Sequence, residues 1–339
     1  METISGRFRA PEIYGDYWFN ADPIPIQALQ GYVILIDFWD YTSQACTRSI
    51  VNVREWVKRY RDLGLVTVGV HTPEFPFGRD PVNVRAAIDR MGIGYPVVMD
   101  NDYIIWGAYR AREWPTKFLI DRNTHIRYIH GGEGSNFNIE QAIQSLIVET
   151  GYHGDLPIPL ESPYDGIRSG TALYKATPKI LSGWQRGSVG NIEGNAPEST
   201  ARYRDPGYYL EGRVYVDGEW FLSRQFIRHD DGESKPGSLI VSYQGARVNL
   251  IVKPEGEKDF QVFVKVDDAW LNRANAGSDI RIDEEGRSYF LADVARNYSI
   301  VRHKEFGAHV LRLTARSNGF ALYALEFTST VIGEPLPAH

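Results

Sequence analysis

Cys46 and Ser43 are the residues whose types and spacing bear most directly on chemistry. Cys46 is the only cysteine among 339 residues, which excludes an intramolecular disulfide and a cysteine-based zinc cluster. Two-cysteine thiol exchange uses a thiolate at a helix N-terminus, where free backbone N–H groups and the helix dipole lower its pKa. A second thiol three residues further on then resolves the mixed disulfide. Ser43 stands three residues before Cys46, so the spacing is present but only one position carries sulfur.

Alternating strand-like and helix-like segments in the first half would position this pair. Residues 32–39 are rich in β-branched side chains and predict a central strand buried on both faces. Apolar residues recur at helical spacing from Ile50 to Tyr60, and Gly64 closes that helix. The other predicted elements are a strand over 65–70, a helix over 81–91, a strand over 95–99, a hairpin of 117–120 with 126–129, and a helix over 138–149. This order predicts an α/β domain with a mixed central sheet flanked by helices.

The second half of the chain has a different pattern. Residues 151–170 contain several prolines and glycines without periodicity, so we place a linker there, between a domain over 1–150 and another over 171–339. Asp217-Gly218 between two alternating runs predicts a hairpin. The short alternating runs are 212–220, 238–243, 248–252, 260–266, 288–292, 310–314 and 321–327. They predict an all-β sandwich of jelly-roll type.

Two ordered motifs carry a resemblance to a known family. The segment from Asp37-Phe-Trp39 to Cys46 resembles the part of the thioredoxin superfamily in which D-F-W on a central strand precedes C-x-x-C. Trp114-Pro115-Thr116, just before a predicted strand, resembles the cis-proline loop of that family, which faces the C-x-x-C. The resemblance implies a thioredoxin-like fold, thiol–disulfide oxidoreductase activity, and a protein or peptide disulfide as substrate or redox partner.

The resemblance also implies roles for particular residues. Asp37 matches a buried carboxylate that tunes the neighbouring thiol, Cys46 matches the resolving cysteine, and Ser43 stands at the position of the nucleophile. The residues expected to contact the substrate are Trp39, Trp114, Pro115 and Thr116. The two tryptophans are expected to form the apolar rim of a peptide groove.

Longer stretches of sequence narrow the resemblance within the superfamily. Ala10-Pro11-Glu12 and the residues that follow resemble the redoxin or TlpA-like branch, which carries an N-terminal hairpin before the core. His71-Thr-Pro-Glu-Phe75 and the β-rich second half are similar to the soluble part of DipZ-like proteins. In those proteins the thioredoxin domain precedes a sandwich that resembles a carbohydrate-binding module, which implies a glycan as a further partner.

Ser43 departs from the family pattern and limits what can be expected of this chain. A serine oxygen cannot take part in disulfide exchange and has no accessible anion near neutral pH without a dedicated base. We therefore expect dithiol exchange to be disabled, whether Ser43 replaced a cysteine in an active parent or is the natural residue. One alternative is a non-catalytic protein that binds peptides or glycans. Another is a one-cysteine peroxidase, because Ser43 fits the hydroxyl position of P-x-x-x-[TS]-x-x-C, although Trp39 occupies its proline position.

Composition excludes several other classes of function. The net charge is −6, which repels polyphosphate and disfavours nucleic acid as a partner. The apolar runs are far shorter than the roughly 20 residues of a membrane span, and residues 1–11 lack the core of an export signal.

We expect no cofactor and no metal site, because the spacing of His153, His229, His303 and His309 is not that of metal ligands. The family resemblance implies an extracytoplasmic setting, whereas the sequence carries no export signal, so the compartment stays open.

Aromatic residues in the second half are candidates for stacking on sugar rings. They are Trp184, Trp220, Trp270, Tyr208 and Tyr209. Because an alternating strand buries one of its faces, we expect Trp220 to lie in the core.

Overall fold

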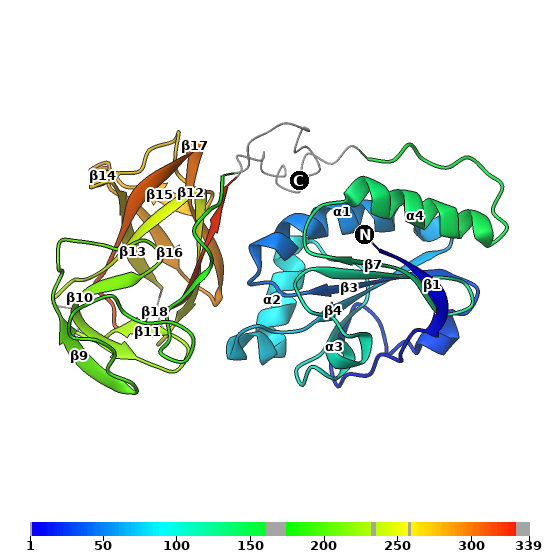
Figure 1. Cartoon of the computed structure of the whole chain (residues 1–339), viewed down its shortest axis with the longest axis horizontal. Helices are drawn as coiled ribbons and strands as arrows, with labels where there is room; N and C mark the ends of the chain where they lie inside the picture. The colour runs from blue at the N-terminus through cyan, green and yellow to red at the C-terminus, as the bar shows by residue number, and fades with distance from the viewer. Residues whose placement is uncertain (1, 161–173, 232–234, 257–258, 330–339) are drawn as a thin grey trace. The chain divides into compact units, whose positions relative to one another are not determined.

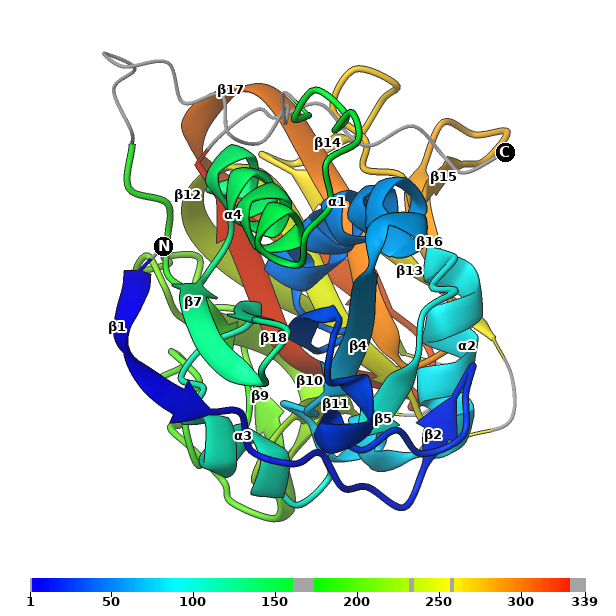
Figure 2. The ribbon, with the colours of Figure 1, turned by 90° about the vertical axis from the view of Figure 1, so that its right-hand side faces the viewer.

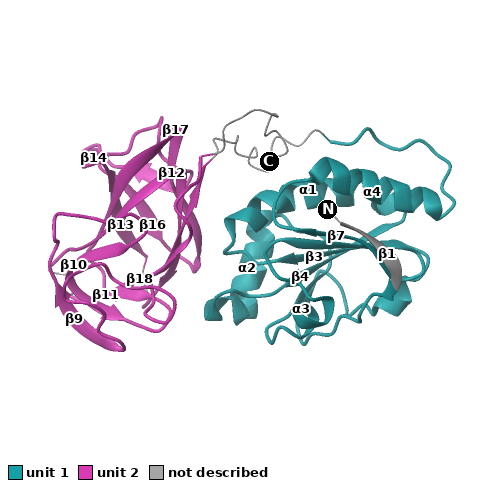
Figure 3. Cartoon of the chain, viewed as in Figure 1, with its two compact units in different colours: residues 1–170, 333–339 teal, residues 171–332 magenta. Residues whose placement is uncertain are grey.

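The computed structural model describes residues 2–160, 174–231, 235–256 and 259–329 (Figure 1). Two compact units divide the chain: Met1–Gly170 with Gly333–His339, and Thr171–Ile332 (Figure 3). Of the linker predicted over 151–170, residues 161–170 lie outside the described residues. Among the described residues, no helix is long and apolar enough to cross a membrane.

The first unit is built on a seven-stranded mixed sheet with the order β1-β7-β6-β3-β4-β5-β2. Its strands are β1 (Glu2–Arg9), β2 (Trp18–Phe19), β3 (Val33–Trp39), β4 (Leu65–His71), β5 (Val97–Met99), β6 (Thr116–Ile120) and β7 (His125–Gly131). The central strands β3, β4 and β5 pair in parallel, and the remaining pairings are antiparallel. All seven residues of β3 are buried, as expected of a strand covered on both faces. The prediction of a mixed sheet flanked by helices is confirmed.

Helices cover both faces of this sheet. They are α1 (Gln44–Tyr60), α2 (Pro81–Met91), α3 (Ile104–Tyr109) and α4 (Asn136–Glu149), with short 3-10 turns η1 (Ile26–Leu29), η2 (Arg61–Leu63) and η3 (Pro76–Arg79). Helices α1 and α4 lie over one face and α3 lies on the other (Figures 1 and 2). The sequence pattern did not predict α3, because its six residues show no helical period. A carboxylate four residues before the helix caps it: Asp100 accepts hydrogen bonds from the backbone N–H groups of Ile105 (3.0 Å) and Trp106 (2.8 Å).

The expected N-terminal hairpin is wrong. Strand β1 pairs with β7 at one edge of the sheet, whereas β2 pairs with β5 at the opposite edge. The intervening chain crosses from one edge to the other, so the two strands never meet. Each strand instead extends one edge of the sheet.

Glu140 is a buried carboxylate that fastens α4 to α1. It accepts hydrogen bonds from Trp56 Nε1 (3.2 Å), the Tyr60 hydroxyl (2.6 Å) and the Arg59 guanidinium. The backbone N–H of Leu160 donates to the same carboxylate at 2.8 Å. These donors surround a charge that burial alone would penalise, so the carboxylate joins two helices and the segment that follows α4.

A Glu140→Ala substitution is expected to lower the free energy of unfolding of the first unit by about 3 kcal/mol, because it leaves several buried donors without an acceptor. Glu140→Gln keeps one acceptor oxygen and should cost less. Urea titration with hydrogen exchange read on peptides of the first unit measures both. Equal losses for the two variants would mean that the hydrogen bonds contribute little.

The second unit is strand-rich, as predicted, and consistent with a β-sandwich. Its strands are β8 (Ile180–Leu181), β9 (Ser199–Tyr203), β10 (Val214–Leu222), β11 (Ile227–His229), β12 (Gly237–Pro254), β13 (Phe260–Val266), β14 (Ala269–Trp270), β15 (Ile280–Ile282), β16 (Ser288–Ala292), β17 (Arg296–Ala315) and β18 (Phe320–Thr328). Strand β12 pairs with β10, β17 and β18. Trp220 lies in the apolar core that these strands enclose, so its predicted burial is confirmed.

The hairpin predicted at Asp217-Gly218 is wrong. Both residues lie inside β10, which continues from Val214 to Leu222. Gly218 has a φ of 103°, a conformation that side chains disfavour, and it marks the point where β10 changes partners. The strand pairs with β12 up to Asp217 and with β9 from Gly218. The glycine therefore redirects the strand and does not reverse it.

Candidate functional site

Ser43 and Cys46 lie together where β3 gives way to α1. Ser43 is the N-cap residue of α1, with an extended backbone (φ −79°, ψ 122°). Its hydroxyl accepts a hydrogen bond from the backbone N–H of Cys46 at 3.4 Å, and its carbonyl accepts one from that of Thr47 at 3.1 Å. The pair therefore occupies the helix N-terminus that thiol chemistry requires.

Cys46 is held as a neutral thiol. Its exposed fraction is 0%, against 9% for Ser43. Burial raises the pKa of the Cys46 thiol far above its usual range, and the Asp37 and Asp40 carboxylates add to that rise. Hydrogen bonds from the backbone of Asp40 and from the Ser43 hydroxyl oppose the rise but are outweighed. Cys46 is therefore the inner member of the pair and a poor nucleophile in the native protein.

We expect iodoacetamide at pH 8 to label Cys46 in the native protein at least about a hundredfold more slowly than in guanidinium chloride, because the folded protein offers neither access nor a thiolate. Mass spectrometry of the labelled protein measures both rates. Fast labelling of the native protein, with an apparent pKa below the ordinary value, would contradict the buried thiol.

Asp37 forms a buried ion pair with Lys117. The two residues face each other across β3 and β6, and their Oδ1 and Nζ atoms are 3.0 Å apart. Lys117 also donates a hydrogen bond to the hydroxyl of Ser49 on α1, at 2.6 Å. Burial raises the pKa of Asp37, and the charge and hydrogen bond of Lys117 act in the opposite direction. The ammonium thus ties the sheet to the helix that carries Cys46.

A second buried carboxylate, Asp40, links the ends of β3 and β4. Its oxygens accept hydrogen bonds from the Thr42 hydroxyl (2.7 Å) and from the backbone N–H of Glu74 (2.9 Å). His71 Nε2 lies 3.5 Å from Asp40 Oδ1, and both side chains are buried. Burial by itself would raise the pKa of Asp40, but His71 and Thr42 together hold it below its usual range. An ionised carboxylate therefore lies behind the Ser43–Cys46 turn.

The Trp114–Pro115 peptide bond is cis. The indole Nε1 of half-buried Trp114 donates to the carbonyl of Thr72 (3.0 Å), which joins this loop to the end of β4. Pro115 is buried, and its carbonyl accepts a hydrogen bond from the backbone N–H of Gly132 (2.8 Å). Thr116 is also buried and begins β6, where it pairs with Phe38 on one side and Gly131 on the other. The backbone next to Pro115 is thus fixed from several directions.

Trp39 does not form the rim of a groove, so that expectation is wrong. Its exposed fraction is 0%, and its ring lies edge-on to His71 at a centroid distance of 5.0 Å. A Cβ atom at Gly69 would lie 3.0 Å from Trp39 Nε1, which shows how closely the indole packs on β4. Trp39 alternates with Phe38 in a strand buried on both faces, so neither face leads to solvent.

Lys117 and Asp40 are the site residues that the sequence reasoning missed. A signal for Lys117 was present, because a lysine at the start of an apolar strand is rarely buried without a partner, and Asp37 is the matching buried acid. Asp40 gave a weaker signal, the Asp-x-Thr spacing of a local side-chain turn with Thr42. Among the described residues, no group of three or more His, Cys, Asp and Glu side chains is arranged to hold a metal ion.

Comparisons with family models define the class of protein. A model described as the AhpC/TSA family matches residues 9–129, and one described as the thioredoxin like C-terminal domain matches residues 179–328. The chain belongs to the thioredoxin superfamily and carries a strand-rich second domain.

Individual relatives narrow this class. Protein DipZ of Mycobacterium bovis is 32% identical over 253 residues, which cover 73% of this chain and 35% of DipZ. Thiol-disulfide oxidoreductase ResA of Halalkalibacterium halodurans is 24% identical over 127 residues, covering 38% of this chain and 69% of ResA. A crystal structure of a thioredoxin-like superfamily protein has a TM-score of 0.40 at 24% identity, covering 44% of this chain and 99% of that one. The chain is DipZ-like, and it spans about a third of the length of DipZ.

Proposed function

We propose that the chain is a thiol–disulfide oxidoreductase scaffold in which Ser43 takes the place of the attacking cysteine, so that dithiol exchange is disabled. The observation that carries the proposal is the placement of the Ser43 hydroxyl at the N-terminus of α1, beside the thiol of Cys46. The name of the relative ResA, a thiol-disulfide oxidoreductase, supports the class of reaction.

The reaction that the scaffold would support has two exchanges. A thiolate at position 43 attacks one sulfur of a substrate disulfide, forming a mixed disulfide and releasing the other substrate sulfur as a thiolate. Cys46, once deprotonated, attacks the sulfur at position 43, which releases the second substrate thiolate and leaves a disulfide between positions 43 and 46. Two electrons pass to the substrate, and an external dithiol must then reduce the protein. With oxygen at position 43, the first bond cannot form.

The neighbouring residues have distinct roles in this proposal. Asp37, paired with Lys117, is the buried group positioned to influence deprotonation of Cys46. Trp114, Pro115 and Thr116 form the loop that holds an extended protein substrate. The backbone of Thr116 is engaged by strands on both sides and the carbonyl of buried Pro115 by Gly132, so side-chain contact with substrate falls mainly to half-buried Trp114.

A non-catalytic binding protein is the second candidate. An inert thiol at Cys46 combined with a cis-proline loop that is intact favours it, because the loop keeps its geometry without the chemistry. Peptide is the ligand that this loop suits. For a glycan, the second unit offers half-buried Trp184 and Trp270 and exposed Tyr208. The burial and raised pKa of Cys46 count against a one-cysteine peroxidase, which needs an accessible thiolate.

The experiment that tests the proposal restores the missing sulfur. Ser43→Cys should reduce insulin disulfides with dithiothreitol as the electron source, followed by turbidity. No gain of turnover in a variant with an unchanged circular dichroism spectrum would overturn the proposed oxidoreductase scaffold. Peptide affinity of the unsubstituted chain, measured by calorimetry, would then support the binding protein.

A further inference from the structure

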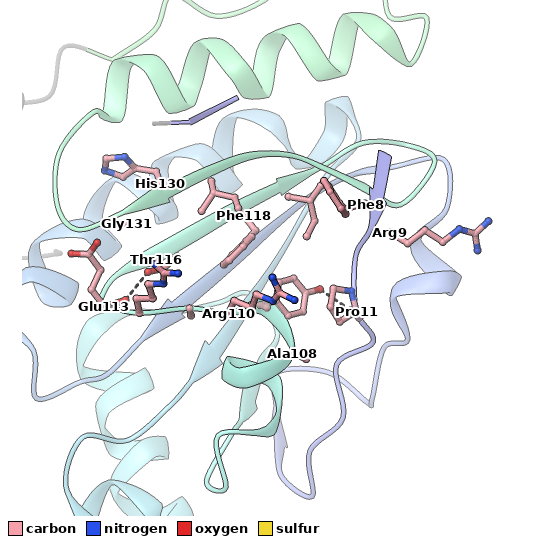
Figure 4. Close-up of a pocket in the computed structure, with 15 residues that line it drawn as sticks. Phe8, Arg9, Pro11, Ala108, Arg110, Glu113, Thr116, Phe118, His130 and Gly131 are labelled. Atoms are coloured by element: carbon pink, nitrogen blue, oxygen red, sulfur yellow. Dashed lines mark hydrogen bonds between the residues drawn. The ribbon is translucent and has the colours of Figure 1, made fainter. Parts of the chain in front are cut away.

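A cavity of about 750 Å³ lies in the first unit, away from the Ser43–Cys46 turn. It is bounded by β1, α3, β6 and β7, and its lining includes neither Cys46 nor Asp37 (Figure 4). Its volume is within the usual range of small-molecule sites, roughly 300–1,000 Å³. Its apolar lining includes exposed Phe8 and Ala108 and half-buried Ile129, together with buried Tyr109, Phe118 and Ile126. The cavity therefore offers an apolar chain or ring a surface to cover.

Arginine side chains make the lining of this cavity positively charged. Arg110 and Arg112 line it, both are exposed, and neither makes an ion pair or side-chain hydrogen bond with any residue in the described ranges. Arg9 also lines the cavity, but its side chain extends away from it in Figure 4. Glu113 is the only acidic residue of the lining. Guanidinium groups are well suited to carboxylates, which they bind through paired N–H donors.

The backbone of Arg110 has a conformation that glycine usually adopts. Arg110 ends α3 in the left-handed region, with φ 55° and ψ 36°. Glycine is the residue that usually occupies such a position, because a Cβ atom is disfavoured there. Replacing Arg110 by glycine would therefore relieve the backbone at this position.

We propose that this cavity binds a small amphipathic carboxylate, with the apolar chain of the ligand on Phe8 and Ile129 and its carboxylate at Arg110 and Arg112. Burial of the ligand's hydrocarbon chain against the apolar lining contributes affinity, and the unpaired guanidinium groups match the charge of its carboxylate. The lining includes Thr116, which follows the cis-proline, but not Ser43, Cys46 or Asp37.

The test uses dodecanoate, below its micelle concentration, as the probe in calorimetric titrations of the full chain. Dodecanoate should bind at one site and more weakly as salt increases, since its carboxylate meets exposed charges. Dodecanol, which lacks the charge, should bind at least about tenfold more weakly, and acetate, which lacks the chain, should not bind detectably. No binding of dodecanoate, or equal binding of dodecanol, would overturn the proposal.

Variants place the binding in this cavity. Arg110→Gly with Arg112→Gln should weaken dodecanoate binding at least about tenfold, whereas the matched control Arg122→Gln, at an exposed arginine of the same unit, should not. Arg110→Gly relieves the left-handed backbone, so Tm should stay level or rise and a lost fold cannot explain lost binding. Ala108→Trp should fill part of the cavity and weaken dodecanoate and dodecanol alike. Unchanged dodecanoate affinity in both the double arginine variant and Ala108→Trp would overturn the proposed site.

Discussion

Ser43→Cys should raise the rate of insulin reduction at least about a hundredfold above that of the unsubstituted chain, because it supplies the one atom that disulfide exchange lacks. The new thiol would stand at the N-cap of α1, where free backbone N–H groups and the helix dipole favour a thiolate. It would also be the more exposed of the two sulfurs, since Ser43 keeps a 9% exposed fraction. Attack from position 43 and resolution from Cys46 follow from that difference in access.

The double variant Ser43→Cys with Cys46→Ala is the matched control. Ellman's reagent, a symmetrical aromatic disulfide, should release two equivalents of its thiolate from Ser43→Cys. The first leaves when the new thiolate attacks, and the second leaves when Cys46 attacks the mixed disulfide. The double variant should release one equivalent and stop. If the product of Ser43→Cys keeps the added mass of a mixed disulfide with the reagent at position 43, Cys46 is not the resolving residue.

Lys117→Met should lower the free energy of unfolding of the first unit by about 4 kcal/mol, because it leaves the buried Asp37 carboxylate without its cation. Asp37→Asn with Lys117→Met removes both charges and should recover much of that loss. Urea titrations with hydrogen exchange read on first-unit peptides measure the effect. If the double variant is as unstable as Lys117→Met, the loss comes from packing and not from the unpaired charge.

The pH dependence separates these two causes further. Burial raises the pKa of Asp37 in the folded state, so the native protein holds this proton to a higher pH than the unfolded chain does. Stability is therefore lost as pH rises through that raised pKa. Lys117→Met removes the influence that lowers the pKa, so its stability deficit relative to the unsubstituted chain should grow as pH rises above 3.8, the ordinary pKa of an aspartate. Asp37→Asn with Lys117→Met should show no such growth.

Much of the first unit could be predicted from the sequence because its elements are strongly patterned. The strand ending at Trp39 and the helix ending at Tyr60 follow from unbroken apolar runs and helical spacing. Two elements were missed for different reasons. Helix α3 has only six residues and no helical period, and its capping carboxylate Asp100 lies outside the helix. Strand β1 gains its hydrogen bonds from β7, more than a hundred residues later. Local patterns carry no record of such contacts.

The same distinction applies to the candidate site. Ser43, Cys46 and Asp37 could be selected because they are close in sequence and separated by a fixed number of residues. Lys117 could not be placed until the pairing of β3 with β6 set it opposite Asp37. Trp39 was misjudged because an aromatic residue beside a motif suits either a groove or a core, and only the strands on both sides of β3 decide between them.

The shared strand of the second unit has a consequence for how that unit comes apart. Strand β12 is 18 residues long and donates its backbone to β10, β17 and β18. Separating any one of these strands from β12 would break backbone hydrogen bonds of the strand to which the other two are also paired. The unit should therefore open as a single cooperative block, with the amide protons of β12 among the last in the chain to exchange with solvent deuterium.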